Sequence, residues 1–355
     1  MIIAEWSGRK VTLYTDTKIQ FRQINVPHNV VGVQVSGDSR TDAMVSIAMD
    51  NGRTWLYKSS GTLVRQLDSE EAHPEAVKPL PGAVFKKVLL VERKEMKIDS
   101  GIVRPVLERI AVRGEDDGKK FTDTARVDAI ADCLKDSAWE LYHDGRLAKI
   151  YARRGFDPRN PVVVVSSHVD MVAERCYAKC DGELWKGSFD NLVTNAVIVA
   201  CMKANAFNPN VMVAFTGDEE TDDGFGGADE VADSLSGKGI AVKHVVVTDV
   251  TEEGWEDEKA FTIENVLPED DESRQQRMAE SLKGAVADID GNPCVIVDGE
   301  PDEAWEYDEY DLPCCSVCMP CRGDMHSEEG VEIRRAGIKA YAEALVAVTN
   351  ARIAM

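Results

Sequence analysis

The stretch of sequence that decides the fold is VVVVSSHVDMV, residues 162–172. A continuous apolar run of this kind is typical of a strand buried on both faces of a parallel sheet. His168 and Asp170 follow where the run stops, and alternation along a strand puts both side chains on the same face. Because open α/β sheets carry their sites at the carboxyl ends of the strands, the stretch predicts a functional site. The simpler interpretation is a strand end that meets water.

Strands and helices alternate around this stretch, which predicts an α/β fold with a mostly parallel sheet flanked by helices. The further strands are expected at 210–220, 244–250 and 314–323. The helices are expected at 122–141, 190–205, 226–235 and, closing the chain, 327–353. The acid-rich segment 252–311 is interpreted as solvated loops around short elements.

The first 80 residues have a different pattern. Short alternating runs are separated by turn signals such as Asn51-Gly52 and Ser60-Gly61, which predicts several short strands in hairpins. The proline-rich stretch 69–83 predicts a linker that reaches to about residue 96. We therefore expect a small β-rich module at 1–80 and a second domain at 97–355. The module has no chemical signature, and it is a candidate surface for homo-oligomer assembly.

Charge and composition exclude some classes of partner. The 355 residues carry a formal net charge of −22, which disfavours binding to nucleic acid and to anionic membranes. No run approaches the roughly 20 apolar residues of a transmembrane helix, and the first residues do not resemble an export signal. The cysteines number nine, which is odd, so we expect reduced thiols and a cytoplasmic location.

Four of these cysteines lie close together in CCSVCMPC, residues 314–321. Spacing of the Cys-x-x-Cys type occurs in zinc and redox sites. However, no second Cys or His pair follows at the spacing of a zinc knuckle, and the segment also has the pattern of an apolar strand. We interpret these cysteines as small buried apolar residues.

Several of the predicted strands and junctions end in a residue type that binds metal ions. The residues are His168, Asp190, Glu219, Glu220, Asp249 and His326. This inventory suits two divalent cations a few Å apart, because two dications repel each other and need an anionic carboxylate between them. Asp190 fits that position. Each cation would then take an imidazole and a further carboxylate, with room for a water whose pKa falls towards neutral. One of the two glutamates remains to accept a proton from this water. Asp170 is the natural acceptor of a hydrogen bond from the second ring nitrogen of His168.

The motifs that carry this pattern are SHVDMV, SFDNLVTNAV, FTGDEE with GGA following, VVVTDVT and CMPCRGDMHSEE. Together with YHDGRLAKIYARRG, they make the chain from about Lys97 onwards resemble the co-catalytic, two-metal metallo-aminopeptidase superfamily. The nearest match is the glutamyl-aminopeptidase and endoglucanase-like tetrahedral aminopeptidase family. The resemblance implies a set of roles: His168 and Asp249 on one metal, Glu220 and His326 on the other, Asp190 as the bridge, Glu219 as general base and Asp170 as orienting carboxylate. It assigns no catalytic role to Arg322.

The resemblance also implies the function. A metal-dependent hydrolase of this kind would cleave amide bonds in peptides or small amides, removing residues from peptide N-termini. Two divalent ions would serve it, with zinc favoured and cobalt or manganese as alternatives. Two other functions stay open: an N-acyl amino acid deacylase or carboxypeptidase-like enzyme with the same ligands, and a non-catalytic scaffold.

The sequence departs from the tetrahedral family in three places. Only residues 171–189 separate Asp170 from Asp190, so the family's inserted β domain is absent and its dodecamers are not implied. The segment 221–228 is longer than the usual glycine turn, and Asn191 stands where an acidic residue is common. None of these departures removes an expected ligand.

Overall fold

The computed structural model divides the chain into two compact units, Met1–Met96 and Lys97–Met355. It describes residues 2–7, 9–15, 20–36, 43–49, 53–67, 90–92, 98–114, 124–221, 224–267, 271–291, 293–296 and 299–351. None of the helices in these ranges is long and apolar enough to cross a membrane.

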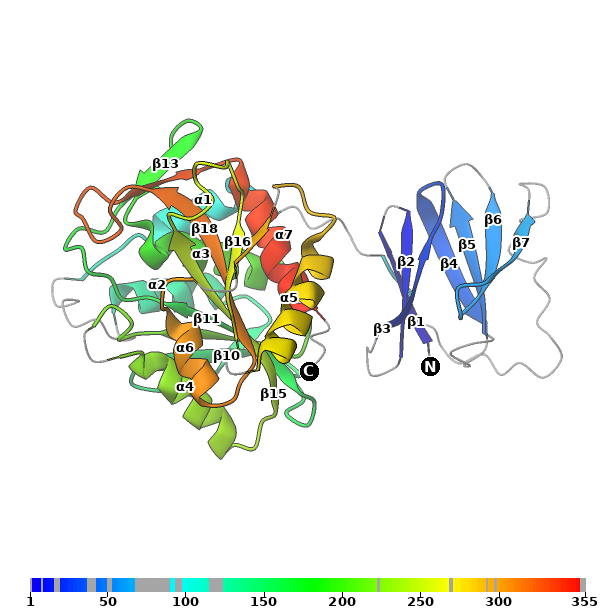
Figure 1. The fold of residues 1–355 in the computed structure, drawn as a ribbon, viewed down its shortest axis with the longest axis horizontal. Coiled ribbons are helices and arrows are strands. Elements are labelled where there is room, and N and C mark those ends of the chain that lie inside the picture. Colours follow the sequence, from blue (N-terminus) through cyan, green and yellow to red (C-terminus); the bar gives the residue numbers. More distant parts are fainter. Residues whose placement is uncertain are drawn as a thin grey trace. The chain divides into compact units, whose positions relative to one another are not determined.

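The first unit consists of two four-stranded sheets that share one apolar core (Figure 1). The strand order is β3-β2-β1-β8 in one sheet and β4-β5-β6-β7 in the other. The strands are β1 (Ile2–Ser7), β2 (Lys10–Thr15), β3 (Gln20–Asn25), β4 (Val30–Ser36), β5 (Met44–Met49), β6 (Thr54–Lys58), β7 (Leu63–Leu67) and β8 (Leu90–Glu92). The hairpins agree with the expected β-rich module. Strand β8 pairs parallel with β1 and lies inside the expected linker, whereas residues 69–83 lie outside the described residues.

The second unit is built on one large sheet with the strand order β12-β13-β19-β18-β15-β11-β14-β10-β9. Its strands are β9 (Trp139–Asp144), β10 (Ala148–Arg153), β11 (Val162–His168), β12 (Ala178–Lys179), β13 (Leu184–Gly187), β14 (Val211–Thr216), β15 (Val242–Thr251), β16 (Thr262–Leu267), β17 (Cys294–Val295), β18 (Cys314–Arg322) and β19 (Val331–Arg334). The four central strands β14, β11, β15 and β18 run parallel, and the flanking pairs are antiparallel. The expected α/β fold class is confirmed.

Helices cover both faces of this sheet. They are α1 (Ser100–Ile110), α2 (Ala125–Leu134), α3 (Phe189–Lys203), α4 (Gly226–Gly237), α5 (Glu272–Val286), α6 (Glu303–Glu309) and α7 (Gly337–Thr349). Helices α3 and α7 pack on one face of the central strands, while α4 and α6 pack on the other (Figure 1). The side chain of Thr124 caps α2 by accepting from the Val127 amide, as expected for a threonine at a helix start.

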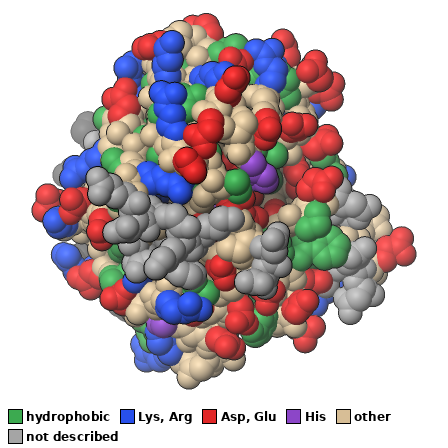
Figure 2. All heavy atoms as spheres, turned by 90° about the vertical axis from the view of Figure 1, so that its left-hand side faces the viewer, with side chains coloured by type: hydrophobic (Ala, Val, Ile, Leu, Met, Phe, Trp, Pro, Cys, Tyr) green, Lys and Arg blue, Asp and Glu red, His purple; other side chains and the backbone are tan. Residues whose placement is uncertain are grey.

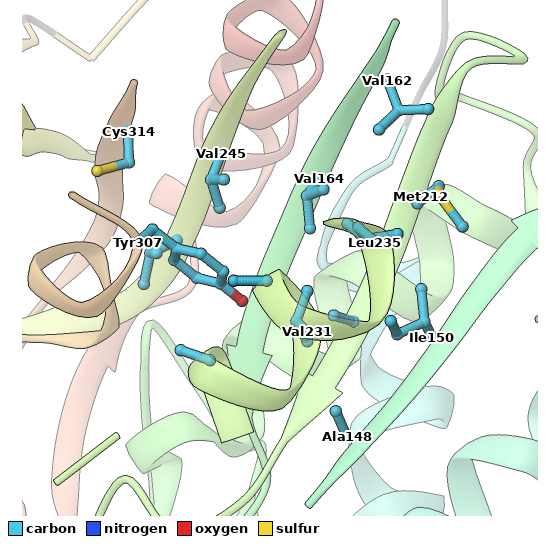
Figure 3. Close-up of a cluster of buried hydrophobic side chains, with 14 of the residues drawn as sticks. Ala148, Ile150, Val162, Val164, Met212, Val231, Leu235, Val245, Tyr307 and Cys314 are labelled. Carbon is cyan, nitrogen blue, oxygen red and sulfur yellow. The ribbon is translucent and has the colours of Figure 1, made fainter. Parts of the chain in front are cut away.

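The core between the sheet and α4 explains why the opening stretch folds as it does. Every residue of β11 is buried, and Val162 and Val164 pack on the α4 face of the sheet. Val231 and Leu235 of α4 lie over them (Figure 3). Because burial of each such side chain contributes about 1.5–3 kcal/mol, the apolar run fixes this strand at the centre of the sheet.

The closing helix is shorter than predicted. Residues 327–353 were expected to form one helix, but β19 occupies Val331–Arg334 and α7 begins only at Gly337. Val331 and Ile333 are buried and alternate with more exposed neighbours, which is the period of a strand. Four residues are too few for this period to stand out beside a long amphipathic pattern.

The interpretation of 252–311 as solvated loops around short elements fits β16, β17 and α6, but it underestimates how much of the segment is folded and buried. The segment contains β16, α5, β17 and α6, and α5 alone spans 15 residues. Three of its acids, Glu264, Asp302 and Glu303, are buried at 4%, 6% and 1% exposure. High acid content therefore concealed the small apolar faces that fold this segment.

The clustered cysteines are buried within β18, and all nine cysteines are free thiols. Alternation along the strand points Cys314 and Cys315 to opposite faces of the sheet, so the four thiols do not converge on one point. Among the residues that the structure describes, the groups able to hold a metal ion include no cysteine.

The buried His244 of β15 gives a prediction about stability. Its Nε2 donates to the carbonyl oxygen of Val348 in α7 at 3.2 Å, and burial lowers the pKa of His244 to about 3. Below pH 6.5 the unfolded chain therefore binds a proton that the folded chain does not, so stability falls as the pH drops from 6.5 towards 3. At pH 5 this loss is about 2 kcal/mol.

We expect His244→Gln to remove that part of the pH dependence, since glutamine stays neutral and keeps a donor for Val348. Urea unfolding of wild type and variant in EDTA, at pH 7 and pH 5, measures the difference. The same loss of stability in both proteins would show that His244 does not cause it.

Candidate metal centre

The acidic and histidine side chains singled out in the sequence meet at the carboxyl edge of the parallel strands. His168 ends β11 and Asp249 lies near the end of β15. Asp190 lies in the first turn of α3. Glu219 and Glu220 follow β14, and His326 follows β18 in a turn.

The centre of the cluster is the buried imidazole of His168, whose side chain is 2% exposed. Its Nε2 lies 3.1 Å from Asp190 Oδ1, 3.7 Å from Asp249 Oδ1 and 3.9 Å from Glu219 Oε2. Three acidic side chains thus surround one ring nitrogen. His168, Asp190 and Asp249 form one of the groups whose ligand atoms lie within 4.8 Å of one another.

A second group lies on the other side of Asp190. The Nε2 of His326 is 3.6 Å from Asp190 Oδ2 and 3.3 Å from Glu220 Oε2. These three residues form another group with ligand atoms within 4.8 Å of one another. Asp190 therefore directs one oxygen to each histidine, which is the arrangement that a carboxylate between two cations requires.

Asp170 lies behind this cluster. Its Oδ1 is 3.5 Å from Nδ1 of His168, and its Oδ2 accepts a hydrogen bond from the Glu220 amide at 3.0 Å. Asn195 donates to the carbonyl oxygen of His168 at 2.8 Å, and Asn191 donates to that of Thr248 at 2.5 Å. These contacts fix the ends of β11 and β15 and the start of α3 relative to each other.

Burial and crowding set the electrostatics of the cluster. Burial raises the pKa of Glu219 to about 7 and that of Glu220 to about 9, and it also raises the pKa of Asp249 well above its usual range. For His168, burial alone lowers the pKa, but Glu219 and the neighbouring aspartates raise it well above its usual value. Burial and the neighbouring acids therefore oppose ionisation of these carboxyl groups, and a bound cation would favour it.

The residues present fit divalent metal ions. Nδ1 of His168, Oδ1 of Asp170 and Oδ1 of Asp190 are buried without a hydrogen bond of ordinary geometry. Buried polar atoms of this kind need a partner, and imidazole with carboxylate is a donor set that zinc, cobalt and manganese accept. Figure 2 shows a surface on which acidic side chains are widely spread, with a histidine side chain among them.

The sequence analysis assigned no role to the buried acids of 252–311, and the structure brings Glu303 beneath this site. Ser166 of β11, two residues before His168, donates a hydrogen bond to Glu303 of α6 at 2.9 Å. A usable signal was present, since Asp302 is a good helix cap and Ala304 and Tyr307 have helical spacing.

Arg322, to which no catalytic role was assigned, makes a cation–π contact in the structure. Its guanidinium carbon lies 5.1 Å from the centroid of the Trp255 ring.

The sequence matches no family model and no curated protein. Among solved structures, the fold is similar to that of the Legionella pneumophila LapA aminopeptidase, with 13% identity, 90% of this chain and 93% of that chain covered, and a TM-score of 0.50. It is also similar to a protein provisionally named a peptidase/endoglucanase, with 13% identity, 70% of this chain and 98% of that chain covered, and a TM-score of 0.50. At this identity the similarity concerns the fold alone. That fold is the α/β arrangement expected from the sequence.

Proposed function

We propose that this protein is a metal-dependent hydrolase that cleaves amide bonds, and that it acts as an aminopeptidase on peptide N-termini. The observation that carries the proposal is the position of Asp190 between two histidines, 3.1 Å from His168 and 3.6 Å from His326. Each histidine has a further carboxylate near its Nε2, Asp249 at 3.7 Å and Glu220 at 3.3 Å. Two three-residue ligand sets that share one aspartate suit two divalent ions.

In this proposal the metals are held by His168 and Asp249 on one side and by Glu220 and His326 on the other, with Asp190 shared. When bound, two such ions would polarise the scissile carbonyl and lower the pKa of a water molecule. Zinc is the favoured ion, with cobalt and manganese as alternatives.

The chain's own residues would move the proton. Glu219 is the proposed general base: its carboxylate accepts the proton of the attacking water and then gives it to the departing amine. The 3.9 Å between Glu219 Oε2 and His168 Nε2 puts this carboxylate beside the cluster. Asp170 would hold the imidazole of His168 in position through Nδ1.

The test is a mixed peptide pool incubated with the zinc-loaded protein and analysed by mass spectrometry. We expect ladders that shorten from the N-terminus, and none in EDTA. The first residues lost would give the specificity. Ladders that shorten from the C-terminus would instead show a carboxypeptidase activity. An untouched pool would contradict both peptidase activities, and N-acylated amino acids would then be the substrates to try.

A further inference from the structure

Three polar side chains, Ser166, Ser316 and Glu264, lie in one row of residues across the sheet, below the metal centre. In the strand register Ser166 pairs with Val247, Val247 pairs with Ser316, and Ser316 pairs with Glu264. Ser166 precedes His168 by two residues, so the two side chains lie on the same face, about 7 Å apart along the strand. This row is buried throughout its length.

The start of helix α6 covers this row. Ser166 donates to Glu303 Oε2 at 2.9 Å, and Tyr307, one turn further along α6, donates to the Ser166 hydroxyl at 2.9 Å. Figure 3 shows Tyr307 reaching over the face of the sheet beside the core valines. Ser316 donates to Asp302, which also caps α6 through the Ala304 amide. Serine hydroxyl groups of the sheet therefore hold the two acids at the start of α6, Asp302 and Glu303.

Glu303 has no basic partner among the residues that the structure describes. The ion pairs found in the described part of the chain do not include it, and its Oε1 is buried without a hydrogen bond of ordinary geometry. Burial raises its pKa to about 7, while Thr216, His168 and Ser166 act in the opposite direction. Its partner Ser166 lies on the strand that ends in His168, which links Glu303 to the candidate metal centre.

We propose that Glu303 is a positioning residue and buried counter-charge for the metal centre. Its carboxylate fixes Ser166 below His168, and its negative charge favours the binding of cations at Asp190. A buried carboxylate without a cation is unfavourable, and charges in a buried setting are screened less by salt than charges at the surface. The inference rests on the proposed function only in requiring that the centre binds metal.

The test compares Glu303→Gln with Glu306→Gln. Glutamine has the shape of glutamate and still accepts from Ser166, so Glu303→Gln removes the charge and keeps the contact. Glu306 lies on the same helix and is half-buried, so its variant is the matched control. Zinc and manganese affinities are measured by competition with a chromophoric chelator. We expect Glu303→Gln to bind about tenfold more weakly, and Glu306→Gln to match the wild type.

Thermal unfolding separates this role from a structural one. With EDTA, Glu303→Gln should be at least as stable as the wild type, and the rise in Tm on adding zinc should be smaller. A lower Tm in EDTA with an unchanged zinc effect would overturn the inference, as would wild-type zinc affinity. If Glu303→Gln fails to fold, Ser166→Ala decides in its place: weaker zinc binding supports the inference and unchanged binding overturns it. A wild-type protein that binds no metal would instead overturn the proposed function.

Discussion

Replacing Glu219 by glutamine is expected to lower kcat by at least about a hundredfold, because removal of a general base typically has an effect of this size. Glutamine fills the same volume as glutamate but cannot accept a proton at neutral pH. Glu219 Oε2 lies 3.9 Å from His168 Nε2, further than the nearest oxygens of Asp190 and Asp249 at 3.1 and 3.7 Å. The variant should therefore keep its metals, and KM should change little. Initial rates on the peptides that the wild type cleaves, with metal content measured in parallel, test this.

The adjacent Glu220 is the matched control for Glu219. Its Oε2 lies 3.3 Å from Nε2 of His326, and Glu220 belongs to two of the candidate ligand groups, whereas Glu219 belongs to one, with His168 and Glu220. Glu220→Gln should therefore lose metal as well as rate, whereas Glu219→Gln should lose rate alone. Retained activity in Glu219→Gln would remove it from the role of base. Metal loss in both variants would make both glutamates ligands.

The fold could be predicted where long patterns and buried strands coincide. The four consecutive valines before Ser166 predict a buried central strand, and the structure places β11 there. The flanking strands were harder to predict, because β13 and β19 have only four residues each and pair antiparallel at the side of the sheet. Their pairing depends on distant partners, and a single short segment does not encode it locally.

The residues of the candidate site also differ in how strongly the local sequence pattern indicates them. His168 and Asp249 could be found because each stands at the end of an apolar strand. Asp190 and His326 lie on a helix start and a turn, where each residue alone is a weaker signal; the joint pattern of ligand types made them candidates, and the motif resemblance supplied their division between two metals. Glu303 was missed because its neighbours are mostly acidic. Its burial is decided by Ser166 on a strand 137 positions away in the sequence.

Replacing Asp190 by alanine is expected to abolish the binding of both metals, with affinity reduced by more than about a hundredfold, since loss of an outer partner alone costs about 10–100-fold. The reason is geometric. Oδ1 and Oδ2 of Asp190 face different histidines, His168 at 3.1 Å and His326 at 3.6 Å, so one substitution removes a ligand from each position. Two dications about 4 Å apart would also repel each other without a carboxylate between them. Metal content per chain after equilibration with zinc and gel filtration measures the effect.

The histidine variants make this prediction specific. In the proposed assignment His168→Ala and His326→Ala each remove an imidazole from one of the two metal positions, so each should retain one metal where Asp190→Ala retains none. His326 is 58% exposed and His168 2%, so His326→Ala should also be the milder change for folding, and it provides the cleaner comparison. One metal retained in Asp190→Ala would show that Asp190 serves a single position. Two metals retained in either histidine variant would show that this imidazole is not a ligand, and the shared-aspartate arrangement would then have to be abandoned.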